Sequence, residues 1–242
     1  MKKLKVVSAF FLALLLNNTI EAQTSEAKPE ISFETFEAKL KQASPNPQIL
    51  DARTVEEYNY NHIKGAIHID AANDAEFQKV ADKLDKKRPV FVYSINNGRS
   101  VTVAKKLKEQ KFSETYVLPG GLSKWIGAGR PVETTVGNGL SVDQYKQLVQ
   151  SEKLVLVDVQ SKFCGGCKKL APIVDSVATE KAGELKVVKI ELFDNKQIGK
   201  ELNIESIPTL ILYKDNKIVW QKSGFTSKDA LDKVISKEIA LK

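Results

Sequence analysis

The sequence predicts two α/β domains joined by a short linker. From residue 31 onward, short apolar runs typical of buried strands alternate with helical patterns, as in sheets covered by helices. The chain has 242 residues, and since a domain usually takes about 100–200 residues, two domains fit. The segment 130–139 has one proline, two glycines and little apolar content, which is typical of a linker.

Each half opens with a predicted helix that is followed by a strand. Ser32 precedes the helical pattern FETFEAKL, and Ser141 precedes VDQYKQLV with Gln144 placed for a capping box. After these openings the patterns diverge, so the halves are not repeats. Apolar runs predict strands at 48–51, 90–93 and 115–118 in the first half, and at 154–158, 185–192, 209–213 and 217–221 in the second.

The first 22 residues have the pattern of a secretory signal peptide. Lys2, Lys3 and Lys5 form a basic start before an apolar run over residues 6–16. That run fits a signal core but is shorter than the roughly 20 residues that span a bilayer. We expect cleavage after Ala22 and no stable membrane insertion. The mature protein is then periplasmic or secreted, in a compartment where disulfides persist.

Composition and charge point to an ordinary globular protein. The chain is 42% hydrophobic and 28% charged, so both halves can bury a core. Its formal net charge of +7 is spread over short clusters such as Lys86-Lys87-Arg88. Clusters of this length are typical of a solvated surface, and an exported protein has little access to nucleic acid. We therefore expect no nucleic-acid binding.

The two cysteines form the strongest local motif. Cys164 and Cys167 are the only ones in the chain, and they follow the strand pattern LVLVD at the start of a predicted helix. Unpaired backbone N–H groups and the helix dipole stabilise a thiolate at such a position. We expect Cys164, nearer the exposed edge, to attack a disulfide, and Cys167, one helical turn further in, to resolve the mixed disulfide.

Two structural interpretations compete with this redox interpretation. A structural disulfide gains little stability from closing so short a loop. A zinc site needs about four ligands, whereas the two histidines, His62 and His68, lie far away in the first half. We expect neither a metal nor a cofactor.

Residues 140–242 resemble thioredoxin at several positions beyond the cysteines. Asp158 precedes Cys164 by six residues, Pro172 follows Cys167 by five, and Ile207-Pro208-Thr209 resembles the cis-proline loop of that family. The resemblance implies a thioredoxin fold with Pro172 in the active-site helix. It also implies that Asp158 is a buried acid that moves protons to and from the resolving thiol.

The same resemblance assigns further residues and shows two departures. It implies that Lys189 pairs with the buried acid, that Gly224 precedes the last helix, and that Phe163, Ile207 and Pro208 contact the substrate chain. Phe163 stands where thioredoxin usually has tryptophan, and Gly166 where it usually has proline. Because residues between the two cysteines tune the redox potential in the family, the Gly165-Gly166 pair leaves the direction of electron flow open.

Residues 31–133 resemble the rhodanese family over nearly their whole length. The segments LDAR at 50–53 and HIKGA at 62–66 resemble its first signature, and PGGLSKW at 119–125 resembles its last. The resemblance implies a parallel sheet wrapped by helices. It also implies that His62 and His68 shape the fold and take no part in catalysis.

The first domain lacks the nucleophile of an active rhodanese. Ser94 stands where the family has its persulfide-carrying cysteine, whereas Arg99 and Ser100 keep the family spacing. A hydroxyl cannot hold sulfane sulfur, so we expect no sulfurtransferase activity. The loop 94–99 is still expected to bind an anion through backbone N–H groups and the charge of Arg99.

Together the two resemblances imply a protein-disulfide reductase of the thioredoxin-like class. Its expected partners are disulfide-containing exported proteins and an upstream electron donor, with the first domain as a docking or spacer module. Reduction is favoured because Pro208 follows Cys167 by only 41 positions, too few for the helical insertion of periplasmic disulfide oxidases. Two alternatives stay open: a partner-binding protein with a static disulfide, and a reductase of persulfides or small sulfur compounds that uses both domains.

Overall fold

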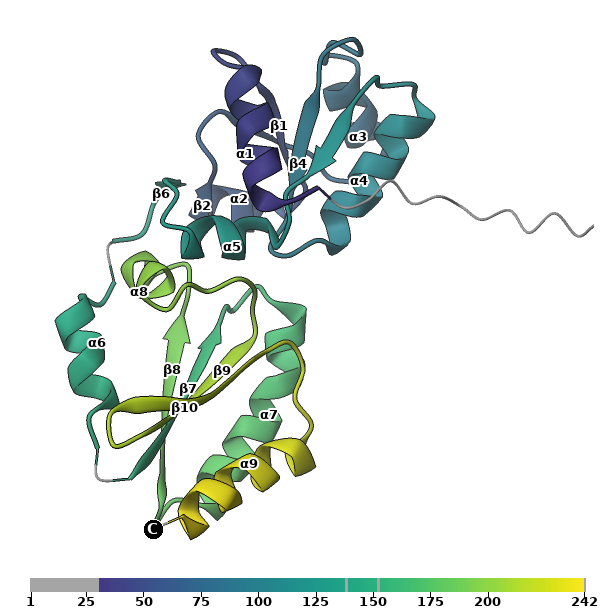
Figure 1. Cartoon of the computed structure of the whole chain (residues 1–242). Helices are drawn as coiled ribbons and strands as arrows, with labels where there is room; N and C mark the ends of the chain where they lie inside the picture. Colours follow the sequence, from purple (N-terminus) through teal and green to yellow (C-terminus); the bar gives the residue numbers. More distant parts are fainter. Residues whose placement is uncertain (1–30, 138, 152, 242) are drawn as a thin grey trace, which may run out of the picture.

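The computed structural model describes residues 31–137, 139–151 and 153–241 (Figure 1). The expected signal segment 1–22 lies outside the described residues. Two sheets, each covered by helices, lie one beyond the other along the molecule, as the alternating sequence pattern predicts. Among the described helices, none combines the length and the apolar composition that a membrane span requires.

The first sheet is parallel throughout, as the sequence predicts. Its strand order is β3 (Ala66–His68), β1 (Gln48–Asp51), β4 (Val90–Tyr93) and β5 (Thr115–Val117). Five helices surround it: α1 (Phe33–Gln42), α2 (Val55–Tyr60), α3 (Asp74–Ala81), α4 (Gly98–Glu109) and α5 (Gly121–Gly127). A parallel sheet of this kind is buried on both faces.

Alternate residues of the central strands face different helices. Leu50 and Val92 pack with side chains of α3 and α4 in one hydrophobic cluster. Ile49 and Phe91, their neighbours in sequence, pack with side chains of α1 and α5 in another. The two-residue period of a strand therefore accounts for two core layers on opposite sides of a single sheet.

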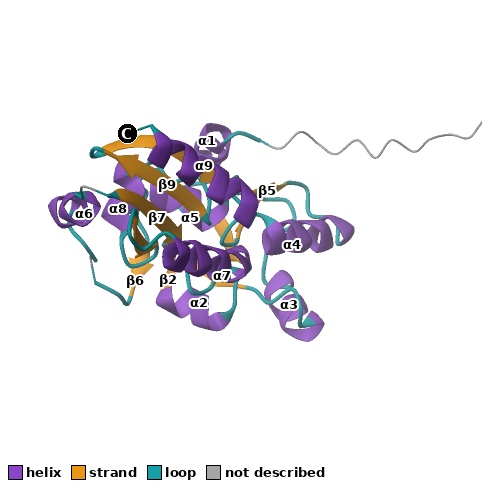
Figure 2. Ribbon diagram, turned by 90° about the horizontal axis from the view of Figure 1, so that it is seen from below, coloured by secondary structure: helices purple, strands orange, loops and turns teal. Residues whose placement is uncertain are grey.

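The second sheet is mixed. Its strand order is β10 (Lys217–Ser223), β9 (Thr209–Lys214), β7 (Leu154–Gln160) and β8 (Leu185–Glu191). Strand β7 is parallel to β8 and antiparallel to β9. Helices α7 (Gly165–Glu180) and α9 (Lys228–Ala240) lie on one side of the strands, and α6 (Val142–Val149) lies on the other (Figure 2).

Side-chain caps begin the helices that the sequence predicts. Ser32 accepts a hydrogen bond from the backbone N–H of Thr35, and Ser141 forms the expected capping box with Gln144. Each cap satisfies a backbone donor that the helix leaves unpaired. Local polar residues therefore fix where α1 and α6 start.

The predicted linker contains a short strand. Strand β6 (Glu133–Thr134) pairs antiparallel with β2 (Asn61–His62) of the first domain. The sequence interpretation of 130–139 missed this pairing because a strand of two residues is too short to show a two-residue period.

The two domains pack against each other. One hydrophobic cluster contains Phe91 and Trp125 of the first domain together with Val157 and Ile207 of the second. Helix α5 packs on α8 (Lys196–Glu201) at the junction (Figure 1). The first domain therefore covers the end of the second sheet from which the loop after β7 emerges.

Candidate functional site

The two cysteines lie where strand β7 gives way to helix α7. Cys164 is the N-cap of α7, and a disulfide joins it to Cys167 in the first turn. The backbone N–H of Cys167 donates to the Cys164 Sγ over 3.1 Å. Because a helix N-terminus favours negative charge, this geometry favours the thiolate of Cys164 once the disulfide is reduced.

Both cysteines are buried in the whole chain. Each is only 3% exposed, so the expectation that Cys164 lies at an exposed edge is wrong for the protein in this conformation. The Cys164 Sγ lies 3.8 Å from the carbonyl oxygen of Ile207. That oxygen is itself covered, because the side-chain amide of Asn96 in the first domain donates to it over 2.9 Å.

The loop before β9 packs against the disulfide. The Ile207–Pro208 bond is cis, as the sequence resemblance implies, and Ile207 is 2% exposed. A Cβ added to Gly166 would lie 3.3 Å from the Pro208 Cδ, so any side chain there would press on the proline ring. The glycine therefore lets the helix start and the proline loop approach closely.

Two further residues of the resemblance occupy the expected places. Pro172 lies inside α7. Gly224 precedes α9 with φ +85° and donates its backbone N–H to the Pro208 carbonyl oxygen over 2.8 Å. Because only glycine adopts a positive φ readily, this residue permits the turn that connects β10 to the proline loop.

Asp158 is a buried acid on β7. It is 2% exposed, and its Oδ1 makes no hydrogen bond within the described residues. Burial raises the pKa of Asp158 to about 6, with the nearby ammonium of Lys189 opposing the rise and Asp175 adding to it. The carboxyl group can therefore exchange a proton near neutral pH.

Lys189 acts on Asp158 through its charge, which opposes the rise in the pKa of that acid, but its direct ion pair is with Asp175. Lys189 stands opposite Asp158 in the register of β8 and β7, but its Nζ bonds the Asp175 Oδ1 on α7 over 2.6 Å. The long side chain reaches past the sheet to a more exposed carboxylate, where its charge keeps more of its hydration. Among the described residues, Asp158 is left without a direct cationic partner.

The loop after β4 in the first domain has a hydroxyl where a rhodanese has its thiol. Ser94 is 2% exposed and donates to the backbone oxygen of Asn96 over 3.1 Å. Its Oγ lies 3.2 Å from the Ser100 Oγ and accepts a hydrogen bond from the Ser100 N–H at 3.4 Å. The hydroxyl is thus used within the loop, which carries no sulfur.

Comparisons with known proteins agree with this geometry. The family model described as Thioredoxin matches residues 138–237, and the one described as Rhodanese-like domain matches residues 34–128. The thioredoxin of Bacillus subtilis (strain 168) is 34% identical over 99 residues, which cover 41% of this chain and 95% of that protein. This chain belongs to the thioredoxin family.

Two other relatives show the same extent of similarity. The thioredoxin of Rickettsia felis is 38% identical over 94 residues, covering 39% of this chain and 90% of that protein. The thioredoxin of Mycobacterium tuberculosis (strain ATCC 25618 / H37Rv) is 39% identical over 89 residues, covering 37% of this chain and 77% of that protein. The chain thus combines a rhodanese-like domain with a thioredoxin domain and is a thiol–disulfide oxidoreductase in its general class.

In the rhodanese-like domain, Arg99 is held by an internal ion pair. Its two terminal nitrogens donate to the carboxylate oxygens of Glu57 over 2.6 and 2.7 Å. Burial opposes ionisation of Glu57, but the bonds from Arg99 and from the Thr54 N–H outweigh it and lower the pKa of Glu57. Arg99 is therefore engaged within the domain and does not supply the free charge that we expected for an anion site.

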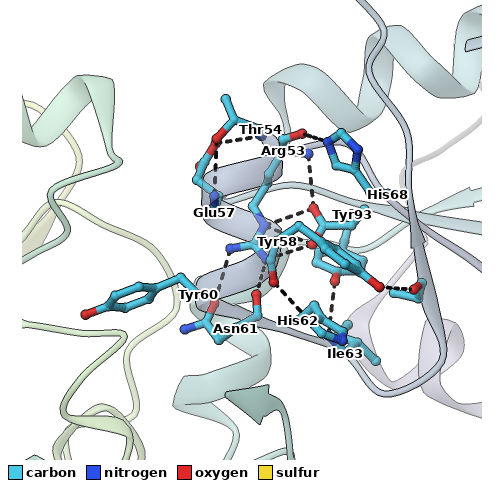
Figure 3. Close-up of polar contacts among 12 residues, drawn as sticks. Arg53, Thr54, Glu57, Tyr58, Tyr60, Asn61, His62, Ile63, His68 and Tyr93 are labelled. Atoms are coloured by element: carbon cyan, nitrogen blue, oxygen red, sulfur yellow. Dashed lines mark hydrogen bonds and ion pairs between the residues drawn. The ribbon is translucent and has the colours of Figure 1, made fainter. Parts of the chain in front are cut away.

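A second polar network supports the strand ends beside that loop (Figure 3). The Arg53 Nε donates to both oxygens of the buried Asp51 over 2.9 and 3.1 Å, and a terminal nitrogen donates to the Asn61 Oδ1 over 3.2 Å. The hydroxyl of Tyr93, the residue before Ser94, accepts from the Ile63 N–H over 3.0 Å. This network holds the strand ends next to the loop that begins at Ser94.

The two histidines belong to the same structural layer. His68 Nε2 lies 2.7 Å from the Arg53 carbonyl oxygen, and His62 Nδ1 lies 2.9 Å from that of Tyr58. Both contacts are drawn in Figure 3. Each imidazole holds a backbone carbonyl, which agrees with a role in shaping the fold.

Sequence reasoning missed two residues that contact the thioredoxin domain. Asn96 bonds the Ile207 carbonyl oxygen, as described above. The Tyr60 ring packs edge-on against Phe163 with centroids 5.4 Å apart, and its hydroxyl bonds Asp194. Figure 3 shows Tyr60 pointing away from the Arg53 network, toward the second domain. Contacts between residues more than 100 positions apart leave no local pattern in one sequence.

Proposed function

We propose that this chain is a cell-envelope thiol–disulfide oxidoreductase that reduces disulfides in exported proteins through Cys164 and Cys167. The observation that carries the proposal is the disulfide at the start of α7, with the Cys167 N–H on the Cys164 Sγ and the cis-proline loop 3.8 Å away. The signal-like segment 1–22 supports export.

The exchange takes two steps. The Cys164 thiolate attacks one sulfur of the substrate disulfide, forms a mixed disulfide and expels the other sulfur as a thiolate, which takes up a proton. The Cys167 thiol then loses its proton and attacks the Cys164 Sγ. This step closes the Cys164–Cys167 disulfide and releases the second substrate thiol. The substrate gains the two electrons that the protein loses, and an upstream dithiol donor returns them.

Asp158 supports the second step by accepting the proton of Cys167. Its buried carboxyl group has no hydrogen-bond partner at Oδ1 and a pKa raised to about 6, so it is a stronger base than an exposed aspartate. A general base works best when its pKa is near the operating pH. Phe163, the residue before Cys164, and the loop residues Ile207 and Pro208 are the proposed substrate contacts, and the Ile207 carbonyl oxygen lies 3.8 Å from the Cys164 Sγ.

Insulin reduction by dithiothreitol tests the activity. The wild-type chain should shorten the lag before the insulin B chain precipitates, and Cys164→Ser should behave like buffer. If the wild-type chain does not shorten the lag, the disulfide is static and the alternative of a partner-binding protein holds. Fractionation of the native host then tests location, since a protein found only with cytoplasmic markers contradicts export.

A second candidate is a reductase of persulfides or small sulfur compounds that uses both domains. The contact between Asn96 and the Ile207 carbonyl favours it, because it brings the rhodanese-like loop to the edge of the disulfide. Sulfide release from thiosulfate in the presence of dithiothreitol, lost in Cys164→Ser, would support it. No sulfide above that of Cys164→Ser would exclude thiosulfate as a substrate.

A further inference from the structure

The rhodanese-like domain meets the thioredoxin domain at its reactive sulfur. The carbonyl oxygen of Ile207 lies 3.8 Å from the Cys164 Sγ and accepts the Asn96 side-chain amide over 2.9 Å. A partner polypeptide whose disulfide reaches Cys164 must lie against the same edge of the proline loop. In the described conformation that edge is already occupied by this chain.

Aromatic and charged side chains form a second contact between the domains, next to the residues that precede Cys164. The Tyr60 ring lies edge-on to Phe163, the residue before Cys164, and its hydroxyl bonds Asp194. The Lys162 Nζ lies 4.1 Å from the centre of the Tyr60 ring, a cation–π distance. Tyr60 therefore contacts both residues that precede Cys164, although Lys162 stays exposed and Phe163 is half-buried.

Helix α5 approaches the second domain through its backbone. A Cβ added to Gly127 would lie 1.8 Å from the Ile204 carbonyl oxygen, and one added to Gly120 would lie 2.7 Å from that of Glu205. Both oxygens belong to the segment that leads into Ile207. The fit leaves no room for even one methyl group at Gly127.

The closed arrangement also contains an unsatisfied polar atom. The Oδ1 of Asn96 is buried and has no hydrogen-bond partner among the described residues. A buried acceptor without a partner costs free energy that water would recover on opening. The Asn96 amide therefore adds to the Tyr60–Asp194 bond and the shared hydrophobic cluster in holding the domains together, while its unpartnered oxygen lowers the stability of the closed state.

We propose that the rhodanese-like domain is a cover on the dithiol site, and that the two domains separate before a partner protein reaches Cys164. In this arrangement Asn96 occupies the edge that a partner chain would use. The inference concerns access to the sulfur, and it rests on the proposed function only for the identity of the partner. Covering the dithiol site requires no cysteine in the rhodanese-like domain, which has Ser94 in place of the family's thiol.

Two variants open the cover by different means. Gly127→Ala places a methyl group against the Ile204 carbonyl, and since Gly127 lies in a helix without a positive φ, alanine suits the helix itself. Asn96→Ala removes the amide donor, so the Ile207 carbonyl oxygen loses this partner in the closed state. Gly183→Ala is the matched control, because its added Cβ would meet nothing within 4 Å.

The measurement is the rate at which the oxidised chain is reduced, by dithiothreitol and, separately, by a reduced bacterial thioredoxin. Acid quenching and mass labelling of free thiols give both rates. With thioredoxin, Gly127→Ala should react about tenfold faster than wild type, as one overpacked contact costs enough to separate the domains. Asn96→Ala should gain about fivefold from the lost hydrogen bond, and Gly183→Ala should match wild type.

Dithiothreitol separates access from intrinsic reactivity. A small thiol needs a narrower opening, so its rates should rise less than those with thioredoxin. Equal rises with both reductants would assign the effect to the disulfide itself and overturn the cover. Thioredoxin rates that match wild type in both variants would overturn it as well. Neither readout needs insulin turnover, so a failure of the proposed function is seen separately.

Discussion

Each domain contains a buried strand, a loop and a helix in succession, but the loop of the first domain presents Ser94 and that of the second presents Cys164. In each, a buried parallel strand ends in a short loop and a helix follows: β4, Ser94 and α4 in the first domain, β7, Cys164 and α7 in the second. Both residues are almost fully buried, at 2% and 3% exposed. The hydroxyl is tied into its own loop, whereas the sulfur can change partners. The strand–loop–helix order is therefore shared, but Ser94 begins its loop whereas Cys164 ends its loop as the N-cap of α7.

The buried acids of the two domains differ in the same sense. Asp51, at the end of β1, is fully buried, and its carboxylate accepts hydrogen bonds from the guanidinium and from the backbone N–H of Arg53. Asp158, on β7, is also buried, but no lysine or arginine among the described residues forms an ion pair with it. The ion pair of Asp51 stabilises the fold. The carboxyl group of Asp158, whose pKa is raised, can instead exchange a proton near neutral pH.

The largest effect is expected at the cysteines. Cys164→Ser should abolish insulin reduction, because no thiolate is left to attack, whereas Cys167→Ser should trap substrates as mixed disulfides that cannot be resolved. Non-reducing gels of the two variants, mixed with insulin, test the order of the roles. Trapping by Cys164→Ser and none by Cys167→Ser would reverse the assignment.

Breaking the paired acid should destabilise the rhodanese-like domain. Arg53→Met leaves Asp51 as an uncompensated buried charge, and we expect a loss of about 4 kcal/mol in the free energy of unfolding. Denaturant titration measures it. Lys79→Met is the control, since it breaks the exposed pair between Lys79 and Glu76 and should cost less than about 1 kcal/mol. Equal losses in both variants would contradict the comparison.

Replacing Asp158, in contrast, should raise the free energy of unfolding. In the folded state the pKa of Asp158 is about 6, above its ordinary value of 3.8, so the folded protein loses stability as pH rises from about 4 to 6. Asp158→Asn escapes that loss and should be more stable by about 3 kcal/mol at pH 8. Below pH 4 the gain should vanish. A gain that is the same at pH 4 and pH 8 would contradict the assignment.

The same substitution should slow the enzyme. An asparagine at position 158 cannot accept the proton of Cys167, so we expect turnover to fall mainly between about pH 6 and 8, where the wild-type carboxyl group is ionised, and to converge with wild type below about pH 6. The pH dependence of insulin reduction measures it. An unchanged pH–rate profile would remove Asp158 from the mechanism while leaving the stability prediction untouched.

The smallest expected effect is a gain of sulfurtransferase activity at position 94 of the rhodanese-like domain. Ser94→Cys, made with Cys164 and Cys167 replaced by serine, should give weak thiosulfate:cyanide sulfurtransferase activity, because the loop keeps its place between β4 and α4. Arg99 stays bound to Glu57, which limits the rate. Mass spectrometry should detect one added sulfur atom after thiosulfate treatment. Neither activity nor added sulfur would mean that the loop has lost more than its nucleophile.

Sequence patterns predicted the parts of the fold that are local. The strands at 48–51 and 90–93 have the predicted bounds, and the capping residues Ser32 and Ser141 begin their helices as expected. Periodicity and caps suffice there because the signal lies within a few neighbouring residues. The disulfide, the cis-proline and the position of Asp158 followed from the spacing of a known family.

The structure revealed what depends on distant contacts or on one side-chain conformation. Lys189 lies beside Asp158 in register, yet its ammonium bonds Asp175, a choice that spacing cannot predict. Asn96 meets Ile207 across the domain junction, and the two-residue strand β6 pairs within the expected linker. None of these contacts leaves a periodic trace in one sequence.

The amide of Asn96 bonds a carbonyl oxygen that lies 3.8 Å from the Cys164 Sγ, so a change at the sulfur can affect the domain junction. If docking favours the disulfide over the dithiol tenfold, it lowers the reduction potential of the pair by about 30 mV, because the two equilibria share one thermodynamic cycle. By the same reciprocity, reduction of Cys164 and Cys167 would then weaken the docking tenfold. Under that condition the rhodanese-like domain would act as an effector within the same chain, because its docking would depend on the redox state of the neighbouring domain.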